Sequence, residues 1–261
     1  MMKDDGINGS MNAGNAKKGP GQDIFEKTLH LVDREEESFA RLQRLIAKLG
    51  IVNPTIYDVG ANVGQSIEKF RRVWPEAEIH SFEPNPPTFA ALASKWGNTR
   101  GIVLNNVALS DSVTTTPFHA TRVSEIASLL SPTERMRAIS TEHKYDYELI
   151  QIQTEMLDNY CLKSNCAKLD ILKIDVQGAE LAVLKGSRAQ LQRGLSSAIY
   201  VETTFADCYE GQTSYSDLLA YLNLFGYQLW DIAPFLYTRR DRIWAANSIF
   251  LSKAASATLE K

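Results

Sequence analysis

Seven short apolar runs, separated by helical patterns, constrain the fold of this chain more than any other feature of its sequence. After Gly50, runs of β-branched and apolar residues alternate with stretches in which apolar residues recur every three or four positions. The expected strands are Thr55–Val59, Glu78–Phe82, Ile102–Leu109, Leu169–Ile174, Ala198–Glu202, Gln228–Ile232 and Ile243–Leu251, and the expected helices cover residues 64–74, 86–96, 179–192 and 214–226. This alternation favours an α/β fold with a doubly wound, mainly parallel sheet.

The last two expected strands are connected differently from the others. Only residues 233–242 separate them, which is too short for the crossover helix of a parallel connection. We therefore expect an antiparallel pair at one end of the sheet. Residues 112–155 also depart from the alternation of strands and helices. Within them, Thr114–His119 is typical of an extra strand, and the polar stretch Ser131–Tyr147 is typical of a mobile excursion.

The sequence divides into a tail, a helix and one large domain. Residues 1–22 are rich in Gly, Asn and Lys and nearly lack large apolar side chains, so we expect a disordered tail. Residues 23–50 are expected to form an N-terminal helical extension that packs on the outside of the main domain. Its apolar residues at helical spacing are Phe39, Leu42, Leu45, Ile46 and Leu49. The main domain is expected over residues 51–253.

Composition argues against several classes of protein. Lys and Arg number 28 against 31 for Asp and Glu, a formal charge of -3, so we expect no nucleic-acid partner. No run approaches the ~18 apolar residues of a membrane helix, and the N-terminus lacks the apolar core of a secretory signal. The three cysteines include no CxxC pair, which indicates reduced thiols rather than disulfides or a zinc site. We expect a cytoplasmic protein with no membrane partner.

The turn after the first strand, in the stretch DVGANVGQ, indicates a bound nucleotide cofactor. Ligands of open α/β sheets lie at the carboxyl ends of the strands, and Gly60 and Gly64 would let the backbone around Asn62 approach one closely. A dinucleotide favours GxGxxG, but the spacing here is GxxxG and Asp58 would repel a pyrophosphate. The same acid suits the cationic aminoacyl group of S-adenosylmethionine, which the sequence therefore favours.

Two further strand ends offer cofactor contacts. Glu83 closes the second strand about 20 residues after the glycine turn, where an acid accepts hydrogen bonds from ribose hydroxyls. The alternative is that Glu83 only caps the strand. Asn106 and Ala108, in NVALSD after the third strand, can flank an adenine ring, although an ordinary strand-to-turn transition explains them equally well.

Taken together, these motifs resemble the FkbM family of S-adenosylmethionine-dependent methyltransferases. DVGANVGQ, SFEPNP, NVALSD, SLL, KIDVQGAE, IYVETTFADCYEGQ and NSIFL follow one another between about Ile56 and Leu251. The resemblance implies a Rossmann-like class I methyltransferase fold, with a mainly parallel seven-stranded sheet and an antiparallel terminal strand. It also implies O-methylation of a sugar or natural product. One departure is Asn247, because many relatives carry an acid near this position.

Methyl transfer to an alcohol needs alignment of the reactants and a base. Asp175 is the first choice because it follows a central apolar strand at the ligand edge, although it can also organise the loop or the cofactor without taking a proton. Glu202 ends the next strand and is the second acid, while His143 is an alternative base in the irregular region. Asp175 and Glu202 together can bind Mg²⁺, but no dedicated ligand spacing supports a metal, and none is predicted.

The leading hypothesis is thus an S-adenosylmethionine-dependent O-methyltransferase. Its acceptor is expected to be a small hydroxylated molecule, such as a sugar, a glycoside or a polyketide. One alternative is a nicotinamide-dependent oxidoreductase, which predicts a GxGxxG motif that the sequence lacks. Another is a non-catalytic nucleotide-binding protein of the same fold. The sequence gives no oligomeric state.

Overall fold

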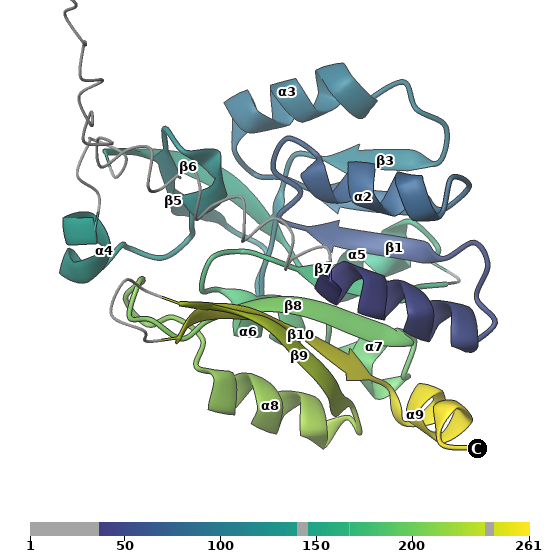
Figure 1. Cartoon of the computed structure of the whole chain (residues 1–261). Coiled ribbons are helices and arrows are strands. Elements are labelled where there is room, and N and C mark those ends of the chain that lie inside the picture. The colour runs from purple at the N-terminus through teal and green to yellow at the C-terminus, as the bar shows by residue number, and fades with distance from the viewer. Residues whose placement is uncertain (1–36, 140–145, 167, 238–242) are drawn as a thin grey trace, which may run out of the picture.

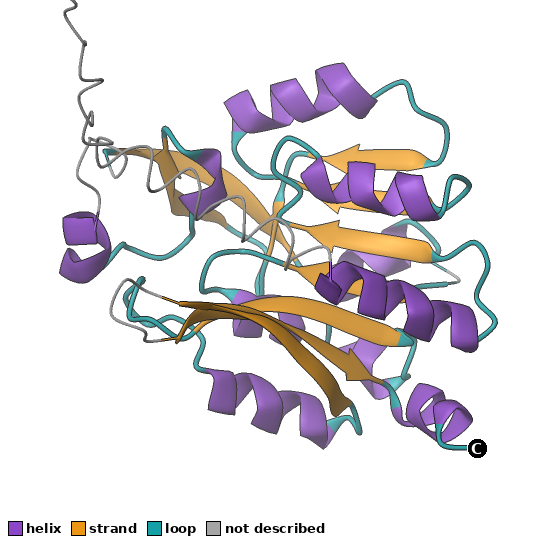
Figure 2. Ribbon diagram, viewed as in Figure 1, coloured by secondary structure: helices purple, strands orange, loops and turns teal. Residues whose placement is uncertain are grey.

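A seven-stranded sheet with helices on both faces forms the centre of the protein, as the computed structural model shows (Figures 1 and 2). The structure describes residues 37–139, 146–166, 168–237 and 243–261, so His143 and the expected tail lie outside the described residues. The strand order is β3-β2-β1-β7-β8-β10-β9. These strands are β1 Thr55–Val59, β2 Glu78–Phe82, β3 Ile102–Asn105, β7 Ile171–Ile174, β8 Ala198–Thr204, β9 Gln228–Tyr237 and β10 Ile243–Leu251.

Strands β1, β2, β3, β7 and β8 are parallel, and β10 lies antiparallel between β8 and β9. This arrangement confirms the expected fold class and the expected antiparallel pair at one end of the sheet. The connection between β9 and β10 is too short for a crossover helix, so the two strands must run in opposite directions.

Two hydrophobic clusters bury the two faces of the sheet. One contains the helix at residues 37–48, α2 and α3, together with α9, and the other contains α5, α6, α7 and α8. The bounds of these helices are α2 Gln65–Val73, α3 Pro86–Trp96, α5 Leu157–Lys163, α6 Glu180–Lys185, α7 Arg188–Gln192, α8 Tyr215–Leu224 and α9 Lys253–Leu259. The helix at 37–48 therefore contributes to the main core, with Leu42 and Ile46 fully buried.

A second, three-stranded sheet stands beside the main one and corrects the expected third strand. Strand β3 ends at Asn105, and Ala108–Leu109 forms β4, which pairs with β6 Tyr147–Glu155. The Asn106 side chain donates to the backbone oxygens of Glu83 and Pro84. The chain turns away from the main sheet at this point, so Ile102–Leu109 is not one strand.

The insert between β4 and β7 is more regular than the sequence indicates. The expected extra strand is present as β5 Thr115–Thr121, which pairs antiparallel with β6. Within the expected excursion Ser131–Tyr147, the described part contains a short helix, α4 Glu134–Ile139. A 3₁₀ turn, η1 Ser124–Ile126, follows β5.

The register of the main sheet brings four loops to one edge. Val59 of β1 pairs with Phe82 and with Ile174, and Ile174 pairs with Val201 of β8. The residues that follow these four positions therefore share the carboxyl edge of the sheet. They are Gly60, Glu83, Asp175 and Glu202.

Candidate active site

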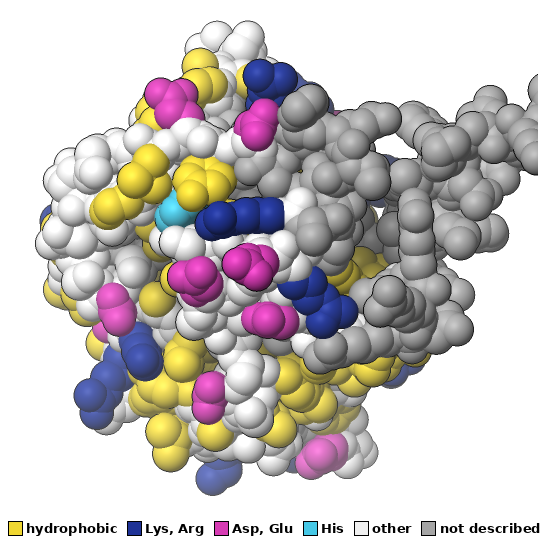
Figure 3. Space-filling view, turned by 90° about the vertical axis from the view of Figure 1, so that its left-hand side faces the viewer, with side chains coloured by type: hydrophobic (Ala, Val, Ile, Leu, Met, Phe, Trp, Pro, Cys, Tyr) yellow, Lys and Arg dark blue, Asp and Glu magenta, His cyan; other side chains and the backbone are white. Residues whose placement is uncertain are grey.

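A cavity of about 410 Å³ lies along this carboxyl edge, a size in the usual range for small-molecule sites. Its walls include the loops after β1, β2 and β7, the strand β8, and the insert at β5 and η1. Figure 3 shows the corresponding face of the molecule, where acidic and basic side chains lie side by side near the centre. The expected site residues that line the cavity are Gly60, Asn62, Glu83, Ala108, Asp175 and Glu202.

Gly60 has a specific steric reason to be glycine. Its φ is +79°, and a Cβ built there would lie 1.8 Å from the backbone oxygen of Asp175. The loop after β1 and the loop after β7 are thus in backbone contact. Gly64 does not line the cavity, and a Cβ built there would meet the indole of Trp96.

Glu83 is buried in the cavity wall, and both of its carboxylate oxygens are held by backbone. Oε2 accepts from the N–H of Asn62 at 3.0 Å, and Oε1 accepts from the N–H of Asn85 at 2.9 Å. Burial raises the pKa of Glu83 to about 7, against these two hydrogen bonds, which lower it. The remaining lone pairs of the carboxylate can accept bonds from ligand hydroxyls.

Asn106 and Ala108 differ in their position relative to the cavity. Ala108 lines the cavity, as an adenine-flanking residue would. Asn106 is exposed and does not line the cavity, and its amide braces the Glu83 loop through the two backbone oxygens described above. Its contribution to the site is therefore indirect.

Asp58 lies beneath the glycine loop and is not a wall residue. It is fully buried, and its Oδ2 accepts a 2.5 Å hydrogen bond from Ser66. The ammonium of Lys173 lies 3.1 Å from Asp58 Oδ1, 2.8 Å from the backbone oxygen of Gly60 and 3.7 Å from Asp175 Oδ2. Asp58 thus forms an internal ion pair with Lys173 and does not line the cavity.

Lys173 is a site residue that sequence reasoning missed. Burial lowers the pKa of this lysine, but the carboxylates of Asp58 and Asp175 raise it by more, so the net shift is upward. A charged residue within the apolar strand LDILKID was the available signal, because buried charges in proteins are paired.

Asp175 and Glu202 face the cavity as a pair. The Asp175 side chain is 35% exposed. The side-chain amide of Gln177 donates to Asp175 Oδ1 and to Glu202 Oε2, both at 2.9 Å. Sequence reasoning did not single out Gln177, and only the tertiary structure places it between the two acids.

Neighbouring polar residues support the loops. Glu180 is buried outside the cavity wall and accepts from the N–H of Gly178 at 2.8 Å, so it stabilises the loop after β7. Burial raises its pKa to about 7. Gln212 bonds the backbone N–H groups of Cys208 and Tyr209, so it shapes the loop after β8.

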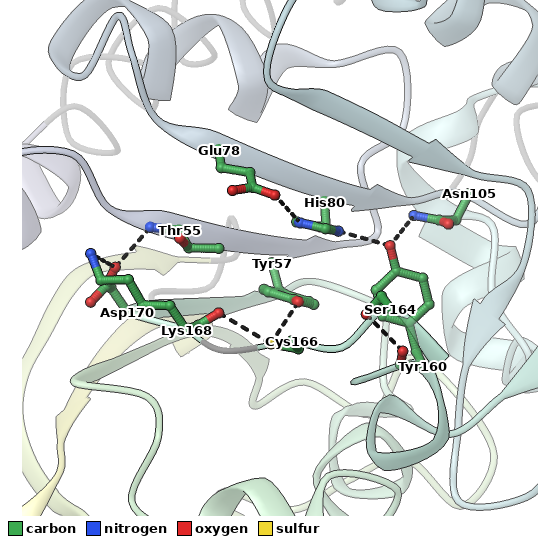
Figure 4. Close-up of polar contacts among 10 residues, drawn as sticks. All are labelled: Thr55, Tyr57, Glu78, His80, Asn105, Tyr160, Ser164, Cys166, Lys168 and Asp170. Atoms are coloured by element: carbon green, nitrogen blue, oxygen red, sulfur yellow. Dashed lines mark hydrogen bonds and ion pairs between the residues drawn. The ribbon is translucent and has the colours of Figure 1, made fainter. Parts of the chain in front are cut away.

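The two histidines within the described residues lie outside the cavity wall. His80 is packed in β2, where its ring stacks on Tyr57 at 4.6 Å and bonds Tyr160 and Glu78 (Figure 4). His80 is therefore a packed strand residue. His119 lies on β5, where it pairs with Ser131.

The cavity residues fit S-adenosylmethionine. Gly60 lets the loop approach a ligand closely, and Glu83 presents carboxylate lone pairs at the wall. The buried Oδ1 of Asn62 accepts no hydrogen bond from the described part of the chain, so a donor of the ligand can satisfy it. Within the described ranges, no three His, Cys, Asp or Glu side chains are grouped to hold a metal ion.

Comparisons with known proteins point to one family. A family model described as the methyltransferase FkbM domain matches residues 58–229. The 2-O-methyltransferase NoeI of Sinorhizobium fredii is 27% identical over 65% of this chain and 71% of that protein. The hexuronic acid methyltransferase AglP of Haloferax volcanii is 28% identical over 57% of this chain and 56% of its own length.

One solved structure supports the fold. The crystal structure of methyltransferase FkbM from Methylobacillus flagellatus has a TM-score of 0.50 and 16% sequence identity. The match covers 76% of this chain but only 43% of that one. At this identity the likeness concerns the fold alone.

Proposed function

The chain belongs to the FkbM methyltransferase family, whose cofactor is S-adenosylmethionine, and on this premise we propose that it methylates a hydroxyl of a small carbohydrate or related natural product. The observation that carries the proposal is the position of Asp175. This carboxylate is partly exposed in the cavity wall, and its backbone touches the Gly60 loop. An acceptor and a cofactor held in one cavity would thus meet beside a carboxylate.

In this proposal, different residues of the cavity wall contact the cofactor and the acceptor. Glu83 accepts hydrogen bonds from the ribose hydroxyls, Asn62 accepts a bond from a donor of the cofactor, and Ala108 leaves room beside the adenine. When bound, the cofactor supplies a methyl group on a positively charged sulfur, which leaves as a neutral thioether. Lys173 keeps the glycine loop and the Asp175 loop together through its bonds to both.

Asp175 is proposed to take the proton of the acceptor hydroxyl. The carboxylate binds the hydroxyl by accepting its hydrogen bond, so the acceptor oxygen is directed toward the methyl group as the proton leaves. Glu202 accepts a bond from a second hydroxyl of the acceptor and fixes its orientation. We also propose that the methyltransferase domain spans residues 51–253.

The acceptor class is inferred from relatives and from the cavity. The names of two relatives describe a 2-O-methyltransferase and a hexuronic acid methyltransferase. Paired carboxylates suit a polyhydroxylated acceptor, since each can accept from a hydroxyl. The aromatic side chain of Trp244 also lines the cavity and can cover the face of a sugar ring.

Among the described residues, none of the helices has the length and apolar character of a membrane span.

The proposal is tested first by binding and then by product formation. We expect S-adenosylhomocysteine to bind in a calorimetric titration and NADH not to bind. A panel of sugars, glycosides and polyketides is then incubated with S-adenosylmethionine, and methylated product is measured by mass spectrometry. Asp175→Asn should lower kcat by about 10²–10⁴ while the protein still binds S-adenosylhomocysteine. Selective NADH binding would favour the oxidoreductase alternative, and cofactor binding without any product would favour the non-catalytic one.

A further inference from the structure

We propose that Gln177 positions Asp175 and Glu202 around the acceptor hydroxyl, and that its amide occupies the place where a divalent cation would otherwise bridge the two carboxylates. This inference rests on the proposed function for the acceptor. It concerns a residue that contacts both acids, so it assigns a positioning role rather than a catalytic one.

The hydrogen bonds of the amide carry the inference. Nε2 of Gln177 lies 2.9 Å from Asp175 Oδ1 and 2.9 Å from Glu202 Oε2. A primary amide has two N–H donors, so each hydrogen serves one carboxylate. Carboxylates that share a site repel each other when both are ionised. The amide joins them without adding charge.

Two other groups hold Gln177 in place, one at its side-chain amide and one at its backbone oxygen. The hydroxyl of Tyr209, a buried residue, lies 3.2 Å from Gln177 Oε1 and 3.1 Å from the backbone oxygen of Ile126, so its one proton is shared between these two acceptors. The hydroxyl of Ser128 donates to the backbone oxygen of Gln177 at 2.7 Å. A flipped amide would turn its oxygen toward both carboxylates, which is electrostatically unfavourable. The insert, the loop after β7 and the loop after β8 therefore converge on Gln177.

The backbone of Gln177 is also unusual. Its φ is +55°, in the left-handed region that few residues other than Gly and Asn adopt. Such a conformation persists only where the surrounding structure holds it, and it is concentrated at functional sites. The strained backbone thus belongs to a residue that lines the cavity.

The position between the acids is also where a cation would bind. Mg²⁺ favours one or two carboxylates together with water and substrate oxygens. The N–H groups of Gln177 point at the same two oxygens, so a bridging cation would have to displace the amide. Methyl transfer by the wild-type protein is accordingly expected to be independent of added divalent cations.

Gln177→Asn separates positioning from folding. Asn tolerates the left-handed backbone but is one methylene shorter, so it cannot reach both carboxylates. We expect an unchanged melting temperature and S-adenosylhomocysteine affinity, with kcat lowered by about tenfold or more. A variant that melts much earlier with unchanged kcat would overturn the inference in favour of a merely structural role.

Gln177→Glu tests whether the amide occupies a position that could bind a divalent cation. This isosteric change replaces the donor with a third carboxylate, so we expect the variant to gain Mn²⁺ binding, measured by loss of the free Mn²⁺ signal in electron paramagnetic resonance. The wild type and the control Gln151→Glu, an equal charge change on an exposed residue of β6, should bind none.

Tight Mn²⁺ binding by the wild type that disappears in Asp175→Asn would overturn the inference, as would activity that requires the cation. The titration needs neither cofactor nor acceptor. If the wild type methylates no acceptor, the proposed function fails, while the Mn²⁺ measurements still decide the position of the amide.

Discussion

At the scale of single residues, burial and backbone contact give the site its properties. Glu83 and Gly60 both follow strand ends at the same edge, yet one is constrained by electrostatics and the other by space. Each constraint predicts a measurable consequence.

Glu83 should make cofactor binding depend on pH. Its folded-state pKa of about 7 lies above the ordinary value, so the carboxyl is mostly protonated below that pH and ionised above it. Ribose hydroxyls donate more strongly to the ionised form. Affinity for S-adenosylhomocysteine should therefore increase by about tenfold between about pH 6 and about pH 8. Calorimetry across this range checks it, and Glu83→Gln should bind weakly with little pH dependence.

The same shift has the opposite sign for stability. A carboxyl with a raised folded-state pKa stabilises the protein fully below its unfolded pKa, and this contribution is lost as pH rises through about 7. If the affinity for S-adenosylhomocysteine does not change between about pH 6 and about pH 8, the assignment of Glu83 to ribose binding is contradicted.

Gly60→Ala should disturb the site more than an equivalent change elsewhere. Gly194 also has a positive φ, of +61°, but a Cβ there would meet nothing within 4 Å. Gly194→Ala is thus expected to cost about 1–2 kcal/mol through backbone strain alone. Gly60→Ala adds a clash with the Asp175 backbone, so it should cost about 1–3 kcal/mol more and weaken S-adenosylhomocysteine binding. Urea unfolding and calorimetry measure both effects, and equal losses in the two variants would refute the steric argument.

At the scale of elements, the expected helix at residues 179–192 is wrong in one respect. The chain forms α6 and α7, separated at Gly186 and Ser187. The carboxylate of Asp158 on α5 accepts from the N–H groups of Ala189 and Gln190, so it caps the start of α7. A cap supplied by another helix leaves no trace in the local apolar pattern.

Asp158 therefore offers a test at this scale. Asp158→Ala leaves the first N–H groups of α7 without their acceptor and should destabilise the protein by about 1–2 kcal/mol. Asp158→Asn keeps a capping oxygen and should cost much less. Urea denaturation compares the variants, and S-adenosylhomocysteine affinity should not change because Asp158 does not line the cavity. Equal stability of the two variants would contradict the capping role.

At the scale of the whole molecule, the helix at residues 37–48 is part of one core with the sheet. Ile46 is fully buried beside residues of β1, α2 and α9, whereas Arg44 on the same helix is exposed. Ile46→Ala should cost about 2–5 kcal/mol of unfolding free energy. Arg44→Ala should change it by less than about 0.5 kcal/mol. Chemical denaturation followed by circular dichroism checks the difference, and a small effect of Ile46→Ala would contradict the shared core.

The sequence by itself determined the alternation of strands and helices, the antiparallel final strand, and the placement of Gly60, Glu83, Asp175 and Glu202 at strand ends. These follow from local periodicity and from the rule that parallel strands end at one edge. Only the tertiary structure decided that Asp58 pairs with Lys173, that Asn106 braces a loop, and that Gln177 lies between two acids. The contacts of Asp58 with Lys173, of Asn106 with the Glu83 loop and of Gln177 with Glu202 join residues on different loops or strands, and hydrogen bonds and ion pairs depend on distances that no local pattern encodes.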